Sequence, residues 1–132
     1  MKSIFFALAL IATGVQAAED ADNNPCDAVE NDVHTLECSA YNKTTAEQLL
    51  KDNYQGLLER FRAEYANNKS QLADITSKLQ VAEQLWVKSR DADCTIAPFP
   101  AAVGSKAYLI DQNDCLANKS DERSEFLESL AQ

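Results

Sequence analysis

The fold is decided by residues 45–86, TAEQLLKDNYQGLLERFRAEYANNKSQLADITSKLQVAEQLW. Apolar side chains recur through this stretch at helical spacing, and the polar pair Asn67-Asn68 divides it into two arms. Neither arm can bury its apolar stripe alone, so we predict an antiparallel helical hairpin with its turn at that pair. A free-standing coiled-coil dimer is the alternative, but about two to three heptads per arm is short for one. The stripe consists of Leu50, Tyr54, Leu57 or Leu58, Phe61 and Tyr65 in the first arm, and of Leu72, Ile75, Leu79, Ala82 and Trp86 in the second.

A short helix is expected before the hairpin, over residues 25–37. Asn24 suits its cap and Pro25 its first position, and apolar residues follow at helical spacing. Residues 39–44 lack that spacing, and Thr44 with Glu47 forms a capping box, so the first arm should begin at about Thr45.

The segment after the hairpin, residues 95–114, holds two of the three prolines and predicts a long loop. Residues 97–100, Ala-Pro-Phe-Pro, should be extended because a residue before proline avoids the helical region. Gly104-Ser105 indicates a turn, and Ser120 suits the cap of a short last helix. The expected fold class is therefore all-α, a long antiparallel hairpin with short N- and C-terminal helices.

The N-terminus has the pattern of a secretory signal peptide. Lys2 precedes the apolar run Ile4–Ala12, and small residues at Val15 and Ala17 suit cleavage after Ala17. A retained membrane anchor is the alternative, but the run is too short to span a bilayer as a helix. We thus predict a signal peptide over 1–17, a flexible acidic leader over 18–24, one domain over 25–132, and a periplasmic or secreted location.

Charge excludes several kinds of partner. The chain has 12 Lys and Arg against 21 Asp and Glu, a net charge of −9. Losing Lys2 with the signal peptide leaves 11 against 21, a net charge of −10. Such a balance argues against nucleic acid and anionic lipid surfaces, and it favours a basic protein partner for what we expect to be a monomer.

Four cysteines in an oxidising compartment predict two disulfides. A zinc site is the alternative, but structural zinc ligands come in closely spaced cysteine pairs, which this sequence lacks. A continuous helix over 25–37 would hold Cys26 and Cys38 about 18 Å apart, too far for a bond. We favour Cys38–Cys94 with Cys26–Cys115, and Cys94–Cys115 is the main competitor.

Catalytic chemistry has little support. His34 is the only histidine and lies among polar residues, which suits a solvated surface side chain. An even cysteine count argues against a free nucleophilic thiol, and a chain this short can hardly build a substrate cleft. We expect no enzyme activity, no metal and no cofactor.

Three motifs lie in helical segments of this sequence. The first comprises Ala46, Glu47, Leu50, Lys51 and Tyr54; the second Ala82, Glu83, Trp86, Ser89, Arg90, Asp91 and Cys94; and the third Cys115, Ser120, Arg123 and Leu127. They resemble the motifs of the LprI-type lysozyme inhibitor family, a domain of unknown function in secreted bacterial proteins. The Trp-Arg-Asp-Cys block is the most specific of them, and the resemblance covers about residues 26–130. Glu47, Lys51, Glu83 and Ser89 depart from the usual Asp, Asn, Gln and aromatic residue of that family.

The resemblance implies a secreted binding protein that inhibits lysozyme by occluding its cleft. A small structural or adaptor protein of the cell envelope is the alternative. Ser105, Lys106 and Tyr108 offer a hydroxyl, a cation and an aromatic hydroxyl beside a turn, so they are the candidate inhibitor contacts. Trp86 should be buried between the long helices. Arg90 is either functional or a structural residue held by Glu122 or Glu125.

Overall fold

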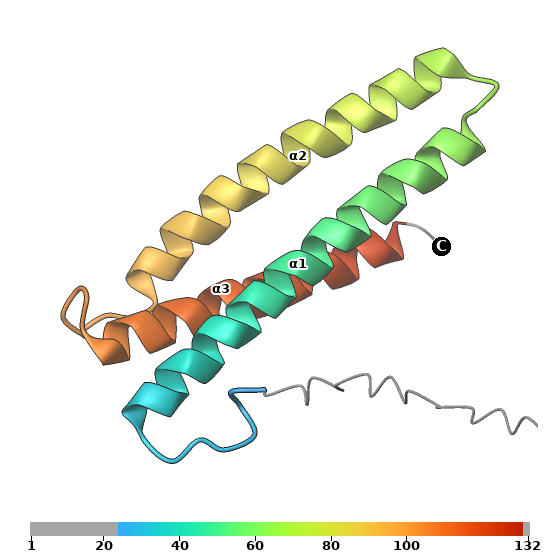
Figure 1. The fold of residues 1–132 in the computed structure, drawn as a ribbon. Helices are drawn as coiled ribbons and strands as arrows, with labels where there is room; N and C mark the ends of the chain where they lie inside the picture. Colours follow the sequence, from blue (N-terminus) through green and yellow to red (C-terminus); the bar gives the residue numbers. More distant parts are fainter. Residues whose placement is uncertain (1–23, 131–132) are drawn as a thin grey trace, which may run out of the picture.

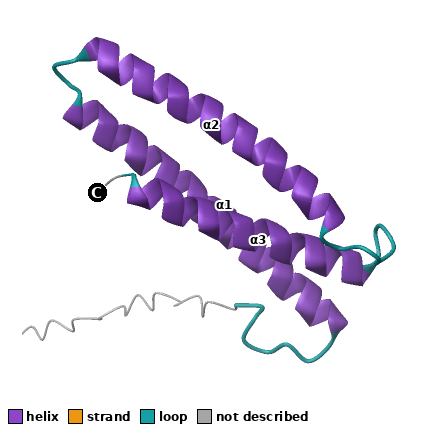
Figure 2. Cartoon of the chain, turned by 180° about the vertical axis from the view of Figure 1, so that it is seen from behind, coloured by secondary structure: helices purple, strands orange, loops and turns teal. Residues whose placement is uncertain are grey.

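The computed structural model describes residues 24–130, which form three helices (Figure 1). Helix α1 (Asp32–Glu64) and helix α2 (Lys69–Ile96) are antiparallel, and helix α3 (Lys106–Ser129) returns alongside α1. Seen from behind, α1 and α3 cross each other, and α2 runs along one side of this pair (Figure 2). The all-α class is confirmed, and α1 and α2 form the predicted long antiparallel hairpin. The two arms do not bury their stripes mainly on each other as predicted, because α1 packs far more extensively against α3 than against α2. The predicted signal peptide and residues 18–23 of the predicted leader lie outside the described residues.

Helix α1 is longer than predicted and continuous. Asn31 caps it, its side chain accepting hydrogen bonds from the backbone N–H of Val33 and His34. The predicted helix over 25–37 and the predicted break over 39–44 are therefore wrong. Thr44 forms no capping box, since its hydroxyl donates to the Ala40 carbonyl at 2.9 Å inside the helix.

The break was predicted because the buried positions of this stretch are small or polar. Ser39 and Ala46 are buried, and they continue the spacing of Leu50 and Leu57 backwards along one face. The Ser39 hydroxyl also accepts a hydrogen bond from the Asn113 side chain of α3 at 3.1 Å. A stripe of small residues lets two helices approach closely, and a search for large apolar residues overlooks it.

The core lies where all three helices meet. The predicted stripe of α1 supplies most of it, and Leu79 of α2 and Leu127 of α3 complete it. Leu127 is fully buried, so α3 closes the hairpin instead of lying at its margin. The buried cluster comprises Leu50, Leu57, Leu58, Phe61, Leu79 and Leu127, with Tyr54, Tyr65, Leu72, Ile75 and Trp86 partly buried against it.

The predicted long loop over 95–114 is also wrong in its bounds. Helix α2 continues to Ile96, and α3 begins at Lys106 with Ser105 as its cap. Ala97 is helical in φ and ψ although Pro98 follows it, so residues 97–100 form a turn and not an extended segment. Ser120 is no cap but a fully buried residue inside α3, which is a full-length helix and not a short one. We call residues 97–105 the corner loop.

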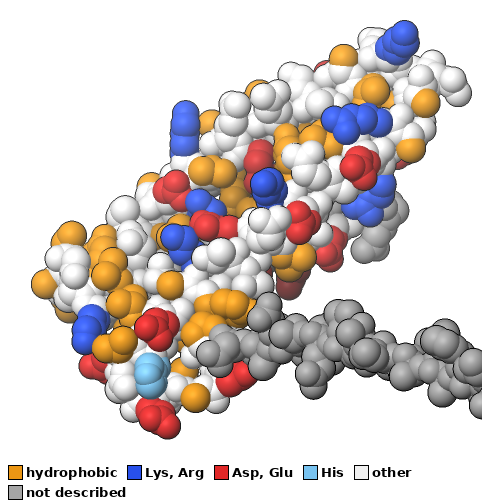
Figure 3. Space-filling view, in the orientation of Figure 1, with side chains coloured by type: hydrophobic (Ala, Val, Ile, Leu, Met, Phe, Trp, Pro, Cys, Tyr) orange, Lys and Arg blue, Asp and Glu red, His pale blue; other side chains and the backbone are white. Residues whose placement is uncertain are grey.

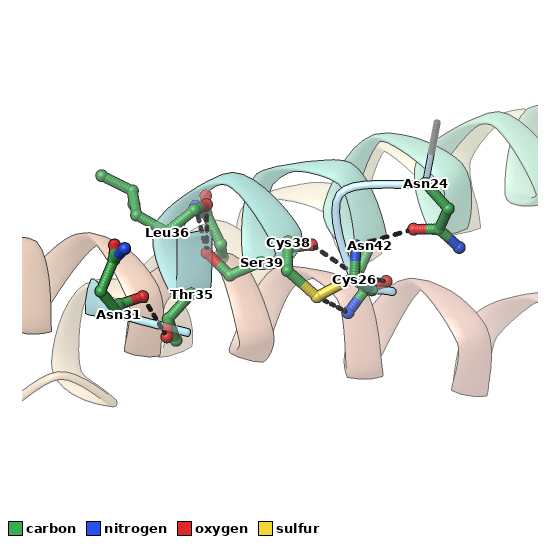
Figure 4. The surroundings of a disulfide bond; sticks show 9 residues. Asn24, Cys26, Asn31, Thr35, Leu36, Cys38, Ser39 and Asn42 are labelled. Carbon is green, nitrogen blue, oxygen red and sulfur yellow. Dashed lines mark hydrogen bonds between the residues drawn. A yellow bond between two sulfur atoms is a disulfide. The ribbon is translucent and has the colours of Figure 1, made fainter. Parts of the chain in front are cut away.

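Two disulfides are present, but not in the favoured pairing. Cys26 bonds to Cys38 and Cys94 bonds to Cys115, so Cys38–Cys94 with Cys26–Cys115 is wrong and the competitor for Cys94 is correct. Residues 25–28 form a turn, in which the Asn24 side chain accepts from the Cys26 N–H at 2.9 Å. The chain therefore folds back along α1, and the Cα atoms of Cys26 and Cys38 lie 4.7 Å apart (Figure 4).

Candidate functional site

The motif residues on α2 and α3 converge on one polar cluster between the helices. Arg90 of α2 is 13% exposed and contacts both other helices. Its Nη1 lies 3.4 Å from Oε1 of Glu47 on α1 and donates to the Ser120 hydroxyl on α3 at 3.3 Å. Its Nη2 lies 2.7 Å from the Asp91 carboxylate. One guanidinium thus ties three helices together, as its fork of donors allows.

Arg123 of α3 makes a second such link to α2. Its Nε donates to Oε2 of Glu83 at 3.0 Å, and the two side chains are 12% and 18% exposed. Its Cζ lies 5.5 Å from the Trp86 ring centroid and 4.8 Å from that of Phe126. Its Nη2 is buried without a hydrogen-bond partner.

Trp86 lies between these two arginines. The Arg90 Cζ is 5.2 Å from its ring centroid, so both guanidinium groups are within cation–π range of the indole. Trp86 is half-buried and packs against the core, less buried than the sequence predicts. We call Glu47, Glu83, Trp86, Arg90, Ser120 and Arg123 the clasp.

The clasp favours the structural interpretation of Arg90 with different partners. Glu47 and Ser120 hold it, and not Glu122 or Glu125. Two of the four departures from the motif, Glu47 and Glu83, supply the carboxylates of the clasp, while Lys51 and Ser89 are exposed. Asp91 orients Arg90 from the adjacent position, and Tyr54 packs against the core.

The candidate inhibitor contacts lie within the first turn of α3 and not on a free loop. The Ser105 hydroxyl oxygen accepts from the Tyr108 backbone N–H at 3.2 Å, which is the capping bond of the helix. Lys106, the first helical residue, is exposed, and Tyr108 is half-buried. Ser105 therefore has a structural role whatever else it contacts. The structure brings these three residues together and separates them from the clasp.

The corner loop also carries residues that the sequence analysis did not select. Phe99 and Val103 are 84% and 86% exposed, and the adjoining Ile96 is 70% exposed. Hydrophobic side chains gather at this end of the molecule (Figure 3). The available signal was two large apolar residues in a Pro-containing segment without helical spacing, where no helix face could bury them.

A shallow groove of about 410 Å³ separates α1 from α3 on another face. Asn42 and Thr45 line it from α1, and Asp114 and Asp121 line it from α3. Burial and the neighbouring carboxylate of Asp111 raise the pKa of Asp114 above its ordinary value. The groove is open to solvent.

His34 lies in the first turn of α1. Its Nδ1 lies 3.4 Å from the Glu30 backbone N–H, near the helix cap. This contact suits a local structural role. Over residues 24–130, no helix combines the length and the apolar character needed to cross a membrane.

Comparisons with known proteins agree with the motifs. The sequence model of the family described as "Lysozyme inhibitor LprI" matches residues 24–127. The crystal structure of a DUF1311 family protein from Pseudomonas putida KT2440 superposes with a TM-score of 0.70 at 39% sequence identity, over 80% of this chain and 98% of that chain. No curated protein matches the sequence significantly. The family match spans both disulfides and the whole clasp, and the chain therefore belongs to the LprI lysozyme inhibitor family.

Proposed function

We propose that this protein is an extracytoplasmic inhibitor of a lysozyme and that it acts by binding, not by catalysis. The match of residues 24–127 to the lysozyme inhibitor family carries the proposal. Several motif residues, among them Trp86, Arg90 and Arg123, hold the helices together in the clasp, which supports looking for the contact with lysozyme on another surface.

Charge supports a lysozyme as the partner. Lysozymes of the animal type are strongly basic, and a chain of net charge −9 is attracted to them over distances of about a Debye length. This attraction should raise the association rate and should weaken as salt is added. It does not by itself select a binding surface.

The corner of the molecule, residues 97–108, is the surface we propose for the contact. The exposed Lys106 can approach the two catalytic carboxylates of a lysozyme cleft. The Tyr108 hydroxyl can donate a hydrogen bond beside it. The Ser105 hydroxyl oxygen is used in the helix cap, but its proton remains able to donate. A corner that occupies the cleft would exclude the polysaccharide substrate.

The decisive experiment is a turbidity assay of cell-wall lysis with the purified mature chain. We expect dose-dependent inhibition of an animal-type lysozyme. Failure to inhibit animal-type, goose-type and phage lysozymes alike would contradict the proposal and favour an adaptor protein of the envelope.

A variant tests the three contacts without disturbing the cap. Lys106→Ala with Tyr108→Phe keeps Ser105 and should weaken inhibition by about tenfold, or about 1.4 kcal/mol. Lys69→Ala is the matched control, because Lys69 is the exposed first residue of α2 as Lys106 is of α3, and lies at the opposite end of the hairpin. Unchanged inhibition by the double variant would remove these side chains from the contact and leave the inhibitor function standing.

A further inference from the structure

We propose that Phe99 and Val103 are an apolar anchor that seats in an apolar pocket of a cationic protein. The inference rests on the proposed function in taking a basic lysozyme as that protein. It assigns the main binding energy to two side chains outside the family motifs and outside the polar set Ser105, Lys106 and Tyr108.

The first observation is the exposure of these side chains. Single exposed apolar residues are common on protein surfaces and need no explanation. Among the large apolar side chains of residues 24–130, Val103, Phe99 and Ile96 have the three largest exposed fractions. All three lie in or next to the corner loop. Clustered apolar exposure on a small acidic protein is typical of a recognition surface. Aromatic side chains in particular dominate the binding energy of protein interfaces.

The second observation is that the corner loop is held firmly in place. The disulfide from Cys94, which is 1% exposed, to Cys115 joins the last turn of α2, just before the loop, to α3. Pro98, which belongs to the loop, is fully buried. The loop also bonds to itself, since the Phe99 N–H donates to the Ile96 carbonyl at 3.0 Å and the Ala101 N–H to the Pro98 carbonyl at 2.8 Å.

The far side of the loop is fixed in the same way. The Ser105 N–H donates to the Ala102 carbonyl at 3.0 Å, and Gly104 takes the positive φ of 82° that turns the chain into α3. A loop held by buried and hydrogen-bonded groups loses little entropy on binding. Phe99 and Val103 are thus presented to solvent on a preorganised support.

The third observation is charge, which selects the occupant. Asp111 and Asp114 lie on the second and third turns of α3, the helix that follows the corner loop, and neither makes an ion pair within the described part of the chain. A second copy of this chain would bring another net charge of −9 and a second pair of these carboxylates. Like charges disfavour that contact, whereas a cationic partner would neutralise them.

The test compares two double variants that remove equivalent apolar groups. Phe99→Gln with Val103→Gln changes the anchor. Val81→Gln with Leu85→Gln is the control, because these α2 side chains are also exposed, at 51% and 61%. Binding of a basic animal-type lysozyme is measured by calorimetry and inhibition by the turbidity assay. We expect the anchor variant to bind at least tenfold more weakly and the control within twofold of the unaltered chain.

Folding is checked by the melting temperature, which neither variant should change because the side chains are exposed. If the anchor variant fails to fold, Val103→Thr alone replaces it, since this change keeps the shape of the side chain and only exchanges one methyl group for a hydroxyl. It should still weaken binding by severalfold.

The outcomes separate the two proposals. An anchor variant that binds as well as the unaltered chain overturns the anchor and leaves the inhibitor function. An unaltered chain that neither binds nor inhibits overturns both. Binding without inhibition, lost in the anchor variant, supports the anchor and overturns inhibition. Light scattering that shows a dimer of the unaltered chain and a monomer of the anchor variant assigns the surface to a second copy and overturns the cationic partner.

Discussion

At the clasp, Arg90 and Arg123 are 13% and 12% exposed, whereas at the corner Phe99 and Val103 are 84% and 86% exposed. Charged side chains are thus largely buried in the clasp, and large apolar side chains are exposed in the corner loop. This is the reverse of the usual distribution. The buried charges are matched by Glu47, Glu83 and an indole ring, which offset most of the cost of their burial, although Nη2 of Arg123 has no hydrogen-bond partner. The exposed apolar groups have no such compensation within residues 24–130.

This difference separates residues that hold the fold from residues that are free to bind. Every clasp side chain has its partners on another helix, so a change there should lower stability. The exposed side chains of Phe99 and Val103 in the corner loop can be changed without lowering the stability of the fold. Many of the family-motif residues lie in the clasp, the core or a disulfide, so the motifs identify the fold well and say little about which surface meets a partner.

The largest expected effect comes from Trp86→Ala. The change removes the packing of the indole on the core and both cation–π contacts, and should lower the free energy of unfolding by about 3 kcal/mol. We place it at the low end for a tryptophan because Trp86 is only half-buried. Chemical denaturation measures it. Trp86→Phe keeps a ring and should lose less, and an unchanged midpoint for Trp86→Ala would show that the clasp does not stabilise the fold.

A smaller effect is expected from Arg123→Ala, of about 2 kcal/mol, because Glu83 is left poorly solvated without its partner. Glu83→Gln is the informative companion. Its amide oxygen can still accept from the Arg123 Nε, so the loss should stay below about 1 kcal/mol. If the two variants lose equal stability, the charge of the pair matters and the hydrogen bond alone does not suffice.

Ser105→Ala tests whether this residue at the end of the corner loop stabilises the fold. Loss of the capping hydrogen bond to the Tyr108 N–H should cost about 1 kcal/mol, seen as a lower melting temperature. Ser105→Asp should restore the cap. A melting temperature unaffected by Ser105→Ala would show that Ser105, like Phe99 and Val103, does not stabilise the fold.

Sequence reasoning predicted the parts of this fold that large apolar residues define. The stripes of the two hairpin arms except Ala82, the turn at Asn67-Asn68 and the burial of Leu127 in the last helix are found. It failed where the buried residues are small. Ser39 and Ser120 are buried at helix contacts, and in the sequence they resemble a loop residue and a cap.

A separate error, the predicted helix over residues 25–37, led to the error in the disulfides. A helix that began at Pro25 would have kept Cys26 and Cys38 apart, but the observed turn brings them together. Likewise, the candidate site was predicted from polar groups near Gly104. The exposure of Phe99 and Val103 depends on how Pro98 is buried beneath them, and this is a property of the packed structure.

The smallest expected effect concerns Asp114, which lies between the two regions on α3. Its pKa is raised above the ordinary 3.8, by burial first and by the negative charge of Asp111 second. The folded chain therefore holds this proton more tightly than the unfolded chain. Its ionisation opposes folding, so the contribution of this group falls as the pH rises from the ordinary value through the raised one.

Asp114→Asn should accordingly raise the melting temperature slightly at pH 7, because the amide carries no charge in the partly buried site. The gain should vanish as the pH falls below the ordinary value of 3.8, where the native carboxyl is neutral in both states. Asp111→Asn provides the control, since it should lower the pKa of Asp114 towards that ordinary value in an NMR titration of the carboxyl carbons. If Asp114→Asn instead lowers the melting temperature at pH 7, the carboxylate accepts a hydrogen bond that stabilises the fold by more than burial and the repulsion from Asp111 destabilise it. Asp114 would then, like the residues of the clasp, stabilise the fold.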